Sequence, residues 1–435
     1  MKRNRGTRVI RTLLLALMAF GFWIPAETGT NVVLITLDTT RSDHLSCYGY
    51  SKPITPNIDA LASSGIVFES ATTQIPLTGP AHASLLTSLH PRSHKAIRNG
   101  VPIDPEVPVL QEILKSRGYA TGAFVSGWTL RRNLTGLDRG FDIYDDHLVD
   151  RYRVVNSQRF ADQTTPLALA WLREHHRQDF LLWVHYFDPH APYRKHKDFF
   201  PADSDIYTAL NPSAQGSQAG KIARYDGEIA FVDHHVGILL DELESLGVRE
   251  ETLVVLTADH GESFGEHGYY GHGRRLYEST MKIPMILSLP GRLPSGYRSR
   301  YPVQTIDVMP TVFSLLGIPQ SQDLEGRDLL PLYREEPSPG TPEIYFETFE
   351  GARKKFWRIF SPKLRGVPLR VGKRVDQWKY IYTPGDDRHE LYDLSRDPGE
   401  TRNLIGKHPE FEALAQQCMD RLPVPVFTAA NEGLE

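Results

Sequence analysis

Long apolar runs without polar alternation punctuate most of this chain. They lie at residues 31–38 (NVVLITLD), 119–125, 180–187, 252–259 and 283–289. Runs that are apolar on both faces are typical of parallel strands covered by helices on each side. Between them, residues 58–64, 81–89, 109–117 and 222–246 show helical spacing. Strands that alternate with helices predict an α/β fold, with a sheet sandwiched between two helical layers.

The pattern changes near residues 333–342 (YREEPSPGTP), where proline and charge indicate a linker. Beyond it come short alternating runs, EIYFETF, WRIFS and WKYIYTP, followed by a helical segment at 409–421. These features predict a small C-terminal antiparallel sheet packed with a helix. We therefore expect a large domain over residues 30–335 and a small α+β subdomain over residues 340–435.

The N-terminal segment has the order of a secretory signal. Basic residues (Lys2, Arg3, Arg5, Arg8 and Arg11) precede an apolar run at 12–24. The run is shorter than the ~20 residues that a spanning helix needs. A buried N-terminal helix is the alternative, which the one-sided charge disfavours. Residues 1–29 are interpreted as a signal peptide or an N-terminal anchor, so the protein is expected to be exported: periplasmic, secreted or membrane-anchored on the outer side.

Composition also limits which kinds of partner and which kinds of metal site we expect. The 435 residues are 40% hydrophobic and 23% charged, as in a chain that buries a core. The net charge of −4 gives no electrostatic reason to expect nucleic-acid binding. Two cysteines, Cys47 and Cys418, are too few for a disulfide framework or a cysteine-built zinc site.

Two of the apolar runs end in acids. Asp38 closes the first run, and Asp259, followed at once by His260, closes the fourth. Because the carboxyl ends of parallel strands share one edge of a sheet, these side chains are expected to meet there. Their oxygen and nitrogen donors suit zinc or manganese better than calcium, which remains an alternative. The competing interpretation is that each acid caps a following helix, and the residues alone leave the two evenly matched.

A third candidate is the segment TGPAHASLL, which begins at Thr78. Proline favours the first helical turn, so we expect Pro80 to open a helix and Thr78 to fall at or just before its N-cap. Unpaired amides at a helix N-terminus can cradle a phosphate or sulfate. A hydroxyl there, beside a metal, could attack such a group. A plain capping threonine is the alternative.

Several motifs, in order, resemble the sulfatase family of the alkaline-phosphatase superfamily over most of residues 31–405. They are NVVLITLDTTRSDHLSCYGY, GPAHASLLTSLHPRSH, VHYFDPHAPY, YDGEIAFVDHHVG, TADHGESFGEHG, LYESTMKIPMI, IDVMPTVFSLLGI and HELYDLSRDPGETRNL. The resemblance implies a large mixed β-sheet sandwiched by helices, a smaller C-terminal sheet, and hydrolysis of sulfate esters, or of phosphate and phosphonate esters in related branches, around a divalent metal.

The resemblance also implies roles for particular residues. Asp38, Asp259 and His260 look like metal ligands, and Thr78 occupies the nucleophile position. His190 resembles the histidine that contacts the sulfuryl or phosphoryl oxygens. His272 lies close to where the family usually has a lysine, although its spacing from Tyr277 is one residue longer. Together with His82, these two histidines are expected to steady the anionic oxygens.

This chain departs from the usual pattern in one direction. Family members carry Cys or Ser in a C/S-x-P-x-R motif, where that residue is oxidised to formylglycine; this chain has Thr78 there and His82 in place of the arginine. Thr39 replaces the second acid of the usual Asp-Asp pair, and His260 replaces an asparagine. The stretch Ser126-Gly127-Trp128-Thr129 lacks the usual lysine and histidine. Formylglycine chemistry is therefore not expected.

Three functions remain in view. The first is a metal-dependent hydrolase of sulfate esters that lacks formylglycine. The second is a hydrolase of phosphate mono- or diesters with Thr78 as the nucleophile, because a phosphorylated threonine is easier to release than a sulfated one. The third is a non-catalytic binding protein that keeps the fold. A small-molecule or glycan anionic ester is the expected substrate.

Overall fold

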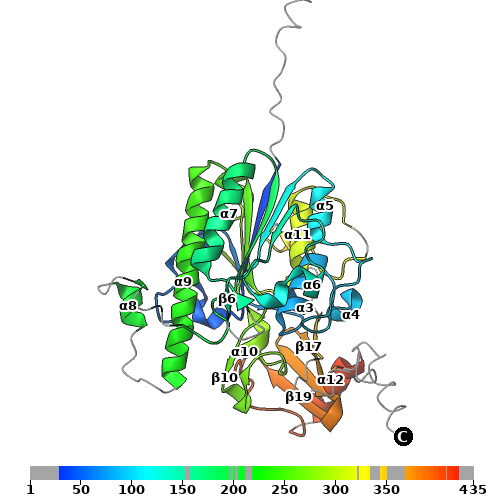
Figure 1. Ribbon diagram of the computed structural model, residues 1–435. Coiled ribbons are helices and arrows are strands. Elements are labelled where there is room, and N and C mark those ends of the chain that lie inside the picture. Colours follow the sequence, from blue (N-terminus) through cyan, green and yellow to red (C-terminus); the bar gives the residue numbers. More distant parts are fainter. Residues whose placement is uncertain are drawn as a thin grey trace, which may run out of the picture.

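An eight-stranded mixed sheet forms the centre of the protein in the computed structural model (Figure 1). Five neighbouring strands, β9, β1, β8, β4 and β5, run parallel, and β13 runs antiparallel to β9 and β2. In sheet order the strands are β14 (Tyr297–Ser299), β2 (Ile66–Phe68), β13 (Met285–Ser288), β9 (Thr252–Ala258), β1 (Asn31–Leu37), β8 (Phe180–Tyr186), β4 (Ala120–Phe124) and β5 (Ile143–Asp145). The predicted α/β fold with a large mixed sheet is confirmed.

The structure describes residues 29–151, 157–194, 196, 199–200, 204–210, 218–320, 323–333, 343–349, 368–407 and 409–420. The predicted signal or anchor, most of the predicted linker and the run WRIFS lie outside these residues. Within them, every helix is too short or too polar to cross a membrane.

Helices cover both faces of the large sheet. Along β1, Val32 and Leu34 face one hydrophobic core, and Val33 and Ile35 face the other, which explains the unbroken apolar run. The first core is closed by α3 (Thr78–Thr87), α5 (Leu110–Lys115) and α11 (Val308–Leu315), the second by α2 (Pro56–Ser63), α7 (Ala161–His175) and α9 (Gln218–Ser245).

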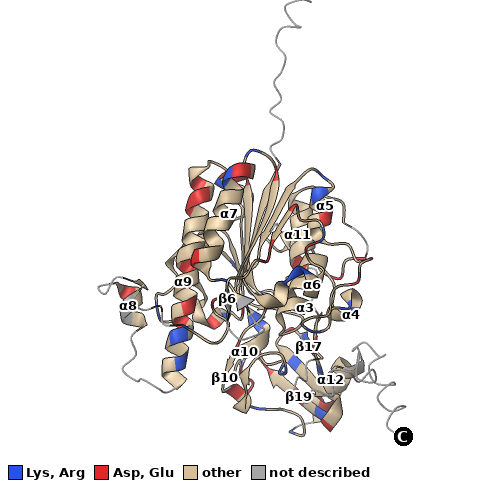
Figure 2. Ribbon diagram, viewed as in Figure 1, with Lys and Arg blue, Asp and Glu red and all other residues tan. Residues whose placement is uncertain are grey.

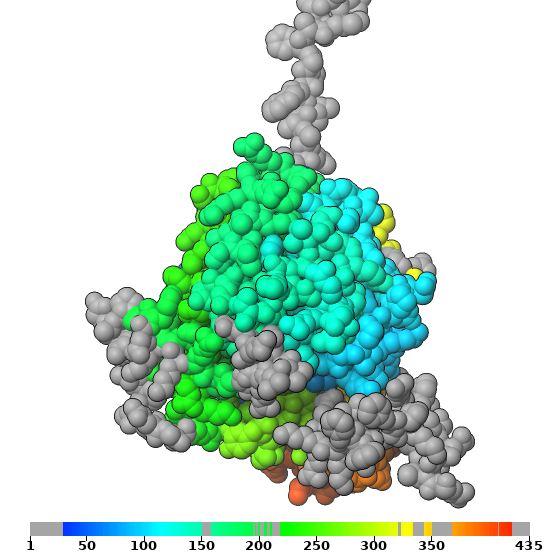
Figure 3. All heavy atoms as spheres, viewed as in Figure 1, coloured from blue at the N-terminus to red at the C-terminus, as the bar shows by residue number. Residues whose placement is uncertain are grey.

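The charge distribution agrees with these layers. Figure 2 shows charged residues on the outer helices, whereas the strands of the large sheet contain almost none. In the space-filling view of Figure 3, the green and cyan outer layer hides the central strands.

The short elements are α4 (Pro91–His94), α6 (Arg132–Thr135), α8 (Asp205–Ala209), α10 (Glu278–Met281), β3 (Ala71–Thr72), β6 (Asp150–Arg151), β7 (Ser157–Gln158), β10 (Ser263–Phe264), β11 (Tyr270–Gly271), β12 (Lys282–Ile283) and β15 (Val303–Gln304).

The C-terminal part forms a separate four-stranded antiparallel sheet with one helix, as predicted. Its strands follow in order, β16 (Glu343–Thr348), β17 (Arg370–Val375), β18 (Trp378–Thr383) and β19 (Arg388–Asp393), and α12 (Pro409–Asp420) packs against one face. The other face packs against Leu276, Tyr277 and Met281 of the larger part. The small sheet therefore supports the segment that follows the loop bearing His272.

Most predicted elements exist, with ends moved by one to four residues. The largest omission is α7, because Pro166 inside it and polar residues at its start hide the helical pattern. The sequence prediction also misses β17 and β19. Three of the six residues in each of these strands are charged, so neither strand has the continuous apolar run that marks the central strands.

Candidate functional site

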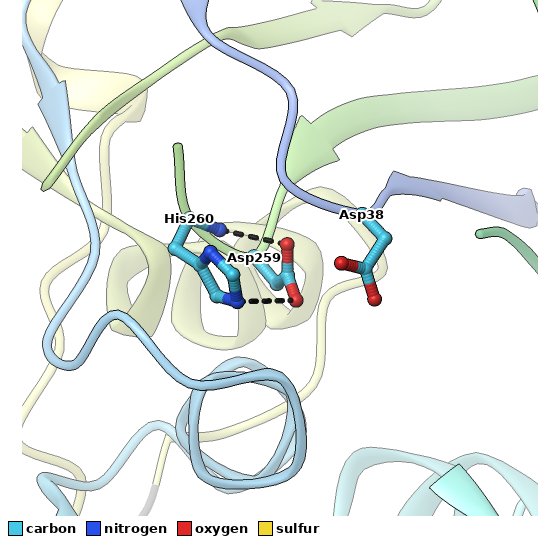
Figure 4. A group of neighbouring side chains, drawn as sticks. All are labelled: Asp38, Asp259 and His260. Atoms are coloured by element: carbon cyan, nitrogen blue, oxygen red, sulfur yellow. Dashed lines mark hydrogen bonds and ion pairs between the residues drawn. The ribbon is translucent and has the colours of Figure 1, made fainter. Parts of the chain in front are cut away.

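Parallel pairing of β1 with β9 creates the first half of the site. Leu37 lies in register with Ala258, so the next residues, Asp38 and Asp259, leave the same edge of the sheet side by side. His260 follows directly. One ligand atom from each of the three lies within 4.8 Å of the others, and all three side chains are buried (Figure 4). The predicted meeting of Asp38, Asp259 and His260 is what the structure shows.

Each of the three residues keeps at least one possible metal-ligand atom that makes no hydrogen bond. Oδ1 of Asp259 accepts the amides of Thr39 (3.0 Å) and His260 (2.8 Å), which leaves Oδ2. Nδ1 of His260 donates to the carbonyl of Gly261 (2.9 Å), which leaves Nε2 as the atom with a lone pair. Both carboxylate oxygens of Asp38, Oδ2 of Asp259 and Nε2 of His260 have no hydrogen-bond partner among the described residues.

The electrostatics of this group are those that a bound cation would relieve. Burial raises the pKa of Asp38 well above its ordinary value, and the carboxylates of Asp259 and Glu262 raise it further. Burial likewise raises the pKa of Asp259 and lowers the pKa of His260. Deprotonated carboxylates this close are stabilised when a cation lies between them, and two oxygens with one imidazole nitrogen suit a divalent metal. The donor set therefore fits the metal that the sequence predicts.

Thr78 begins α3 beside this group. Its N-cap is Leu77, so Thr78 is the first helical residue rather than the cap, and the helix begins two residues before Pro80, where it was expected to open. The reason is that proline is tolerated throughout the first turn, where its missing amide has no intrahelical acceptor. The Thr78 hydroxyl is buried without a partner of good geometry among the described residues, and it lies close enough to Asp38 to lower the pKa of that carboxyl.

The start of α3 offers fewer free amides than the expected cradle would need. The amide of Gly79 donates to Oδ1 of Asn99 (2.8 Å), Pro80 has none, and the amide of Ala81 donates to the carbonyl of Leu77 (2.9 Å). Side chains are therefore the main candidates for hydrogen-bond donors to an anion at this end of α3.

His82 lies one turn into α3 and is completely buried. Its Nδ1 lies 2.8 Å from the carbonyl of Thr78 and must donate to it, since a carbonyl only accepts. Its Nε2 lies 3.0 Å from the hydroxyl of Thr36, which also accepts the indole N–H of Trp183 (2.9 Å). Both ring nitrogens of His82 already take part in hydrogen bonds. His82 is therefore placed to hold the Thr78 carbonyl, and neither nitrogen is left for the expected contact with anionic oxygens.

His190 and His272 lie beside this group, next to His260. The ring of His190 stacks on Phe187 at 4.4 Å, and its Nδ1 donates to the carbonyl of Ala191 (2.8 Å). The ring of His272 lies 5.1 Å from that of His190 and 4.4 Å from that of His260. Burial lowers the pKa of His190 to about 4. Burial also opposes the charged form of His272, but Glu262 and Asp259 outweigh it and raise its pKa.

The structure adds two residues that the sequence prediction misses. His185 on β8 places Nε2 3.3 Å from Oδ2 of Asp38 and accepts the amide of Ser126 at Nδ1 (3.3 Å). Glu262 lies 3.3 Å from Nδ1 of His272. Glu262 follows Asp259-His260-Gly261 directly, so its position was a usable signal. His185 sits inside an apolar run, where a lone histidine gives little signal.

The departures from the family pattern have structural consequences. Thr39 holds a left-handed φ of 52°, which is strained for a β-branched residue. Its hydroxyl donates to the carbonyl of Pro189 (2.8 Å), so Thr39 links the end of β1 to the loop after β8. A side chain at Gly127 would meet the ring of Phe187 at 2.5 Å, which excludes a lysine in this backbone. The hydroxyl of Thr129 is buried without a hydrogen-bond partner among the described residues.

Comparisons with known proteins identify the fold. A family model described as Sulfatase matches residues 30–318, and one described as N-sulphoglucosamine sulphohydrolase, C-terminal, matches residues 265–424. The chain is 27% identical over 424 residues to the ulvan-active sulfatase of Formosa agariphila, covering 91% of this chain and 80% of that protein.

Two solved structures share the fold. One, in complex with its substrate D-glucosamine-2-N,6-O-disulfate, superposes with a TM-score of 0.74 at 22% identity, covering 90% of this chain and 96% of that one. The other is the phosphonate monoester hydrolase of Agrobacterium radiobacter. It superposes with a TM-score of 0.70 at 22% identity, covering 90% of this chain and 94% of that one. The resemblance seen in the sequence motifs is confirmed.

Proposed function

This chain belongs to the sulfatase family and is a hydrolase acting on ester bonds, and from that premise we propose that it cleaves sulfate esters without formylglycine, using a divalent metal and the hydroxyl of Thr78. One observation carries the proposal: the Thr78 hydroxyl is buried, makes no hydrogen bond of good geometry among the described residues and lies close enough to Asp38 to lower the pKa of that carboxyl. A capping threonine would bond to an amide of its own helix, whereas this one is the first helical residue and makes no cap bond.

Asp38, Asp259 and His260 would hold the metal, with zinc or manganese favoured by the mixed oxygen and nitrogen donors. A divalent ion bound there would stabilise negative charge on the nucleophile and on the ester oxygens. Nδ1 of His260 donates to a carbonyl, an arrangement typical of metal-binding histidines, because it fixes the ring and directs Nε2 outward.

Around the nucleophile, each residue has a task that follows from its contacts. His82 holds the carbonyl of Thr78 and so fixes the first turn of α3. His190 and His272 face the same space from the loops after β8 and β9 and are placed to contact the ester oxygens. Attack by Thr78 Oγ1 forms a bond to sulfur and breaks the bond from sulfur to the leaving oxygen, and the proton that the Thr78 hydroxyl loses balances the one that the leaving oxygen takes up. Water then releases the bound group from Thr78.

A phosphate mono- or diester is the second candidate substrate. Two observations favour it: a threonine replaces the convertible residue, and His260 replaces the usual asparagine. A sulfated threonine lacks the hemiacetal route by which formylglycine expels sulfate, whereas a phosphorylated threonine can be opened by a second in-line attack. The phosphonate monoester hydrolase of the same fold shows that the fold accommodates phosphorus chemistry.

The test compares nitrophenyl sulfate, nitrophenyl phosphate and bis-nitrophenyl phosphate with protein loaded with zinc or manganese. Thr78→Ala should abolish turnover, and Thr78→Ser should retain part of it. Rapid acid quenching followed by peptide mass spectrometry should find the transferred group on the Thr78 peptide. Sulfate release that survives Thr78→Ala would overturn the mechanism, and phosphoester cleavage alone would select the second candidate. Inactive protein that retains no metal would favour a non-catalytic binding protein.

We further propose an exported location, from the N-terminal charge and apolar pattern, and a boundary between a catalytic domain (30–335) and a C-terminal subdomain (340–435). The substrate is proposed to be an anionic ester of a glycan or a small molecule. Two similar proteins support this: one is an ulvan-active sulfatase, and the other binds a disulfated glucosamine as its substrate. Fractionation of cells expressing the full chain tests the location.

A further inference from the structure

Three arginines that the proposed function leaves unused lie next to His272. Arg274 and Arg275 follow it in the same loop, and Arg370 is the first residue of β17 in the small sheet. All three are half-buried. Among the described residues, no aspartate or glutamate forms an ion pair with any of them, so this group carries three positive charges without a counter-ion from that part of the chain.

Hydrogen bonds hold Arg370 against the loop that carries His272. Nη1 of Arg370 donates to the carbonyl of Arg274 (2.6 Å). The hydroxyl of Thr348, which lies opposite Arg370 in the register of β16 and β17, donates to the carbonyl of Gly273 (2.5 Å). The edge of the small sheet, below the large one in Figure 1, therefore meets the residues directly after His272. Because consecutive Cα atoms are ~3.8 Å apart, the Cα of Arg274 lies within ~8 Å of that of His272.

The guanidinium groups of Arg274 and Arg275 stay close to this loop. The hydroxyl of Tyr269 donates to the carbonyl of His272. Burial raises the pKa of that hydroxyl and the charge of Glu262 raises it further, but the positive charges of Arg274 and Arg275 oppose the rise. A charge acts strongly on a pKa only over a few ångströms, so both guanidinium groups lie near the Tyr269 hydroxyl and hence near His272.

The environment of Arg370 is short of negative charge. Burial lowers the pKa of Arg370, and the neighbouring charges of Arg275 and Arg388 lower it further. The carboxylate of Glu390 opposes this shift, but its Oε1 already accepts the hydroxyl of Tyr277 and a guanidinium N–H of Arg388, both at 2.8 Å. An anion bound beside Arg370 and Arg275 would stabilise both charges.

An oxyanion is the ligand that suits such a group. A guanidinium presents a planar fork of N–H donors, which matches two oxygens of a sulfate or a carboxylate. Nη1 of Arg370 donates to a carbonyl, and its Nε is buried without a hydrogen-bond partner among the described residues. Arginines that only brace the fold are expected to pair with acids, as Arg388 does with Glu390 (2.8 Å). The arginines beside His272 do not follow that pattern.

We propose that Arg274, Arg275 and Arg370 bind a second anionic group of the substrate, a sulfate or a carboxylate, while the ester to be cleaved lies at Thr78. This inference rests on the proposed function and narrows its substrate class to esters that carry two anionic groups. The arginines take no part in making or breaking bonds. They bind and orient the substrate, so their loss should raise KM more than it lowers kcat.

The first experiment measures binding without turnover. Calorimetry compares α,ω-alkanedisulfonates of increasing length with the alkanesulfonates of the same lengths, on metal-loaded protein. Sulfonates resemble sulfate but have no ester bond to cleave. The best disulfonate should bind the parent protein ~10-fold more tightly than its monosulfonate, and Arg275→Gln should remove most of that advantage. Added salt should reduce the advantage in the parent protein.

Two further variants separate an anion site from a structural brace. Arg370→Lys keeps the charge without the planar fork, so it should retain part of the disulfonate advantage. Arg298→Gln is the matched control, because its guanidinium pairs with Glu69 (2.7 Å) on the edge strand β14, and it should retain all of the advantage. Equal affinities for disulfonate and monosulfonate in the parent protein, no binding of either, or an advantage that survives Arg275→Gln combined with Arg370→Gln would overturn the proposal.

The second experiment measures turnover of meta-carboxyphenyl sulfate and of meta-carbamoylphenyl sulfate, which has nearly the same shape without the charge. Arg275→Gln should lower kcat/KM for the carboxyl compound ~10-fold, mainly through KM, and leave the carbamoyl compound nearly unchanged. Equal losses with both would overturn the anion site. A disulfonate preference in protein that cleaves no ester would leave the arginine site standing and refute the proposed function. Cleavage of nitrophenyl sulfate without that preference would do the reverse.

Discussion

The two sides of the site differ in how they are built. On the metal side, Asp38, Asp259 and His260 leave adjacent parallel strands in register, and all are buried. On the anion side, His190 and His272 lie on loops and depend on local partners for their orientation. Strand ends fix positions through backbone pairing, whereas loops need a separate hydrogen bond for each side chain. The metal side should therefore fail as a unit, and the anion side residue by residue.

The largest effect is expected from the metal side. Asp259→Asn removes one charge and one ligand oxygen while keeping the shape, and it should cost at least ~1,000-fold in kcat/KM, or roughly 4 kcal/mol. It should also reduce bound metal, measured by mass spectrometry of the desalted protein. Removing the metal with a chelator should lower the Tm of the parent protein more than that of the variant, because only the parent loses a bound ion.

The Asp259→Asn variant also tests whether the three residues of the metal side act as a unit. If Asp259→Asn keeps its full metal content, then Asp38 and His260 hold the ion without it, and the three residues do not act as a unit. Asp233→Asn is a suitable control, since that buried carboxylate bonds to Asn57 (2.8 Å) and Ile58 (2.8 Å), away from the site. Its metal content should not change.

On the anion side, His190→Gln should cost ~100-fold to 1,000-fold in kcat, because it removes one donor to the ester oxygens. Its metal content should stay at the level of the parent protein. The affinity of the metal-loaded protein for inorganic sulfate or phosphate, measured by calorimetry, should fall together with kcat. Loss of metal in His190→Gln would show that the two sides are not separable.

Sequence reasoning was most successful where the backbone decides the geometry. Asp38 and Asp259 could be placed because parallel strands share an edge, and that placement needs no knowledge of the side-chain surroundings. Glu262 and His185 were missed because each acquires its task only from a distant partner, His272 or Asp38. The strained φ of Thr39 depends on three segments that meet in space. The start of α3 was misplaced because Pro80 is compatible with several positions in the first turn.

A smaller effect is expected at His82, which holds the Thr78 carbonyl and the Thr36 hydroxyl without touching substrate. His82→Leu leaves the Thr78 carbonyl and the Thr36 hydroxyl without their partner, and should cost ~2–4 kcal/mol in the free energy of unfolding. It should lower kcat by ~10- to 100-fold with little change in KM or metal content, because Thr78 loses its support. Thr36→Val is the matched comparison, since it removes the bonds that His82 Nε2 and Trp183 make to the hydroxyl but keeps the bond from His82 to the Thr78 carbonyl. Equal losses of kcat in both variants would argue against a specific hold on Thr78.

The smallest effect is expected at Thr39, which connects the two sides. Thr39→Gly relieves a left-handed backbone that costs a β-branched residue ~1–2 kcal/mol, but it removes the hydroxyl bond to Pro189, worth ~1 kcal/mol. The free energy of unfolding should therefore change by less than ~1 kcal/mol, as measured by urea denaturation. The Pro189 bond anchors the loop that carries His190, so anion binding should weaken a few fold while metal binding stays intact, because the amide of residue 39 still reaches Asp259. Thr39→Ser, which keeps the hydroxyl, should restore anion binding. If Thr39→Gly instead loses metal, the link through this residue serves the strand ends rather than the loop.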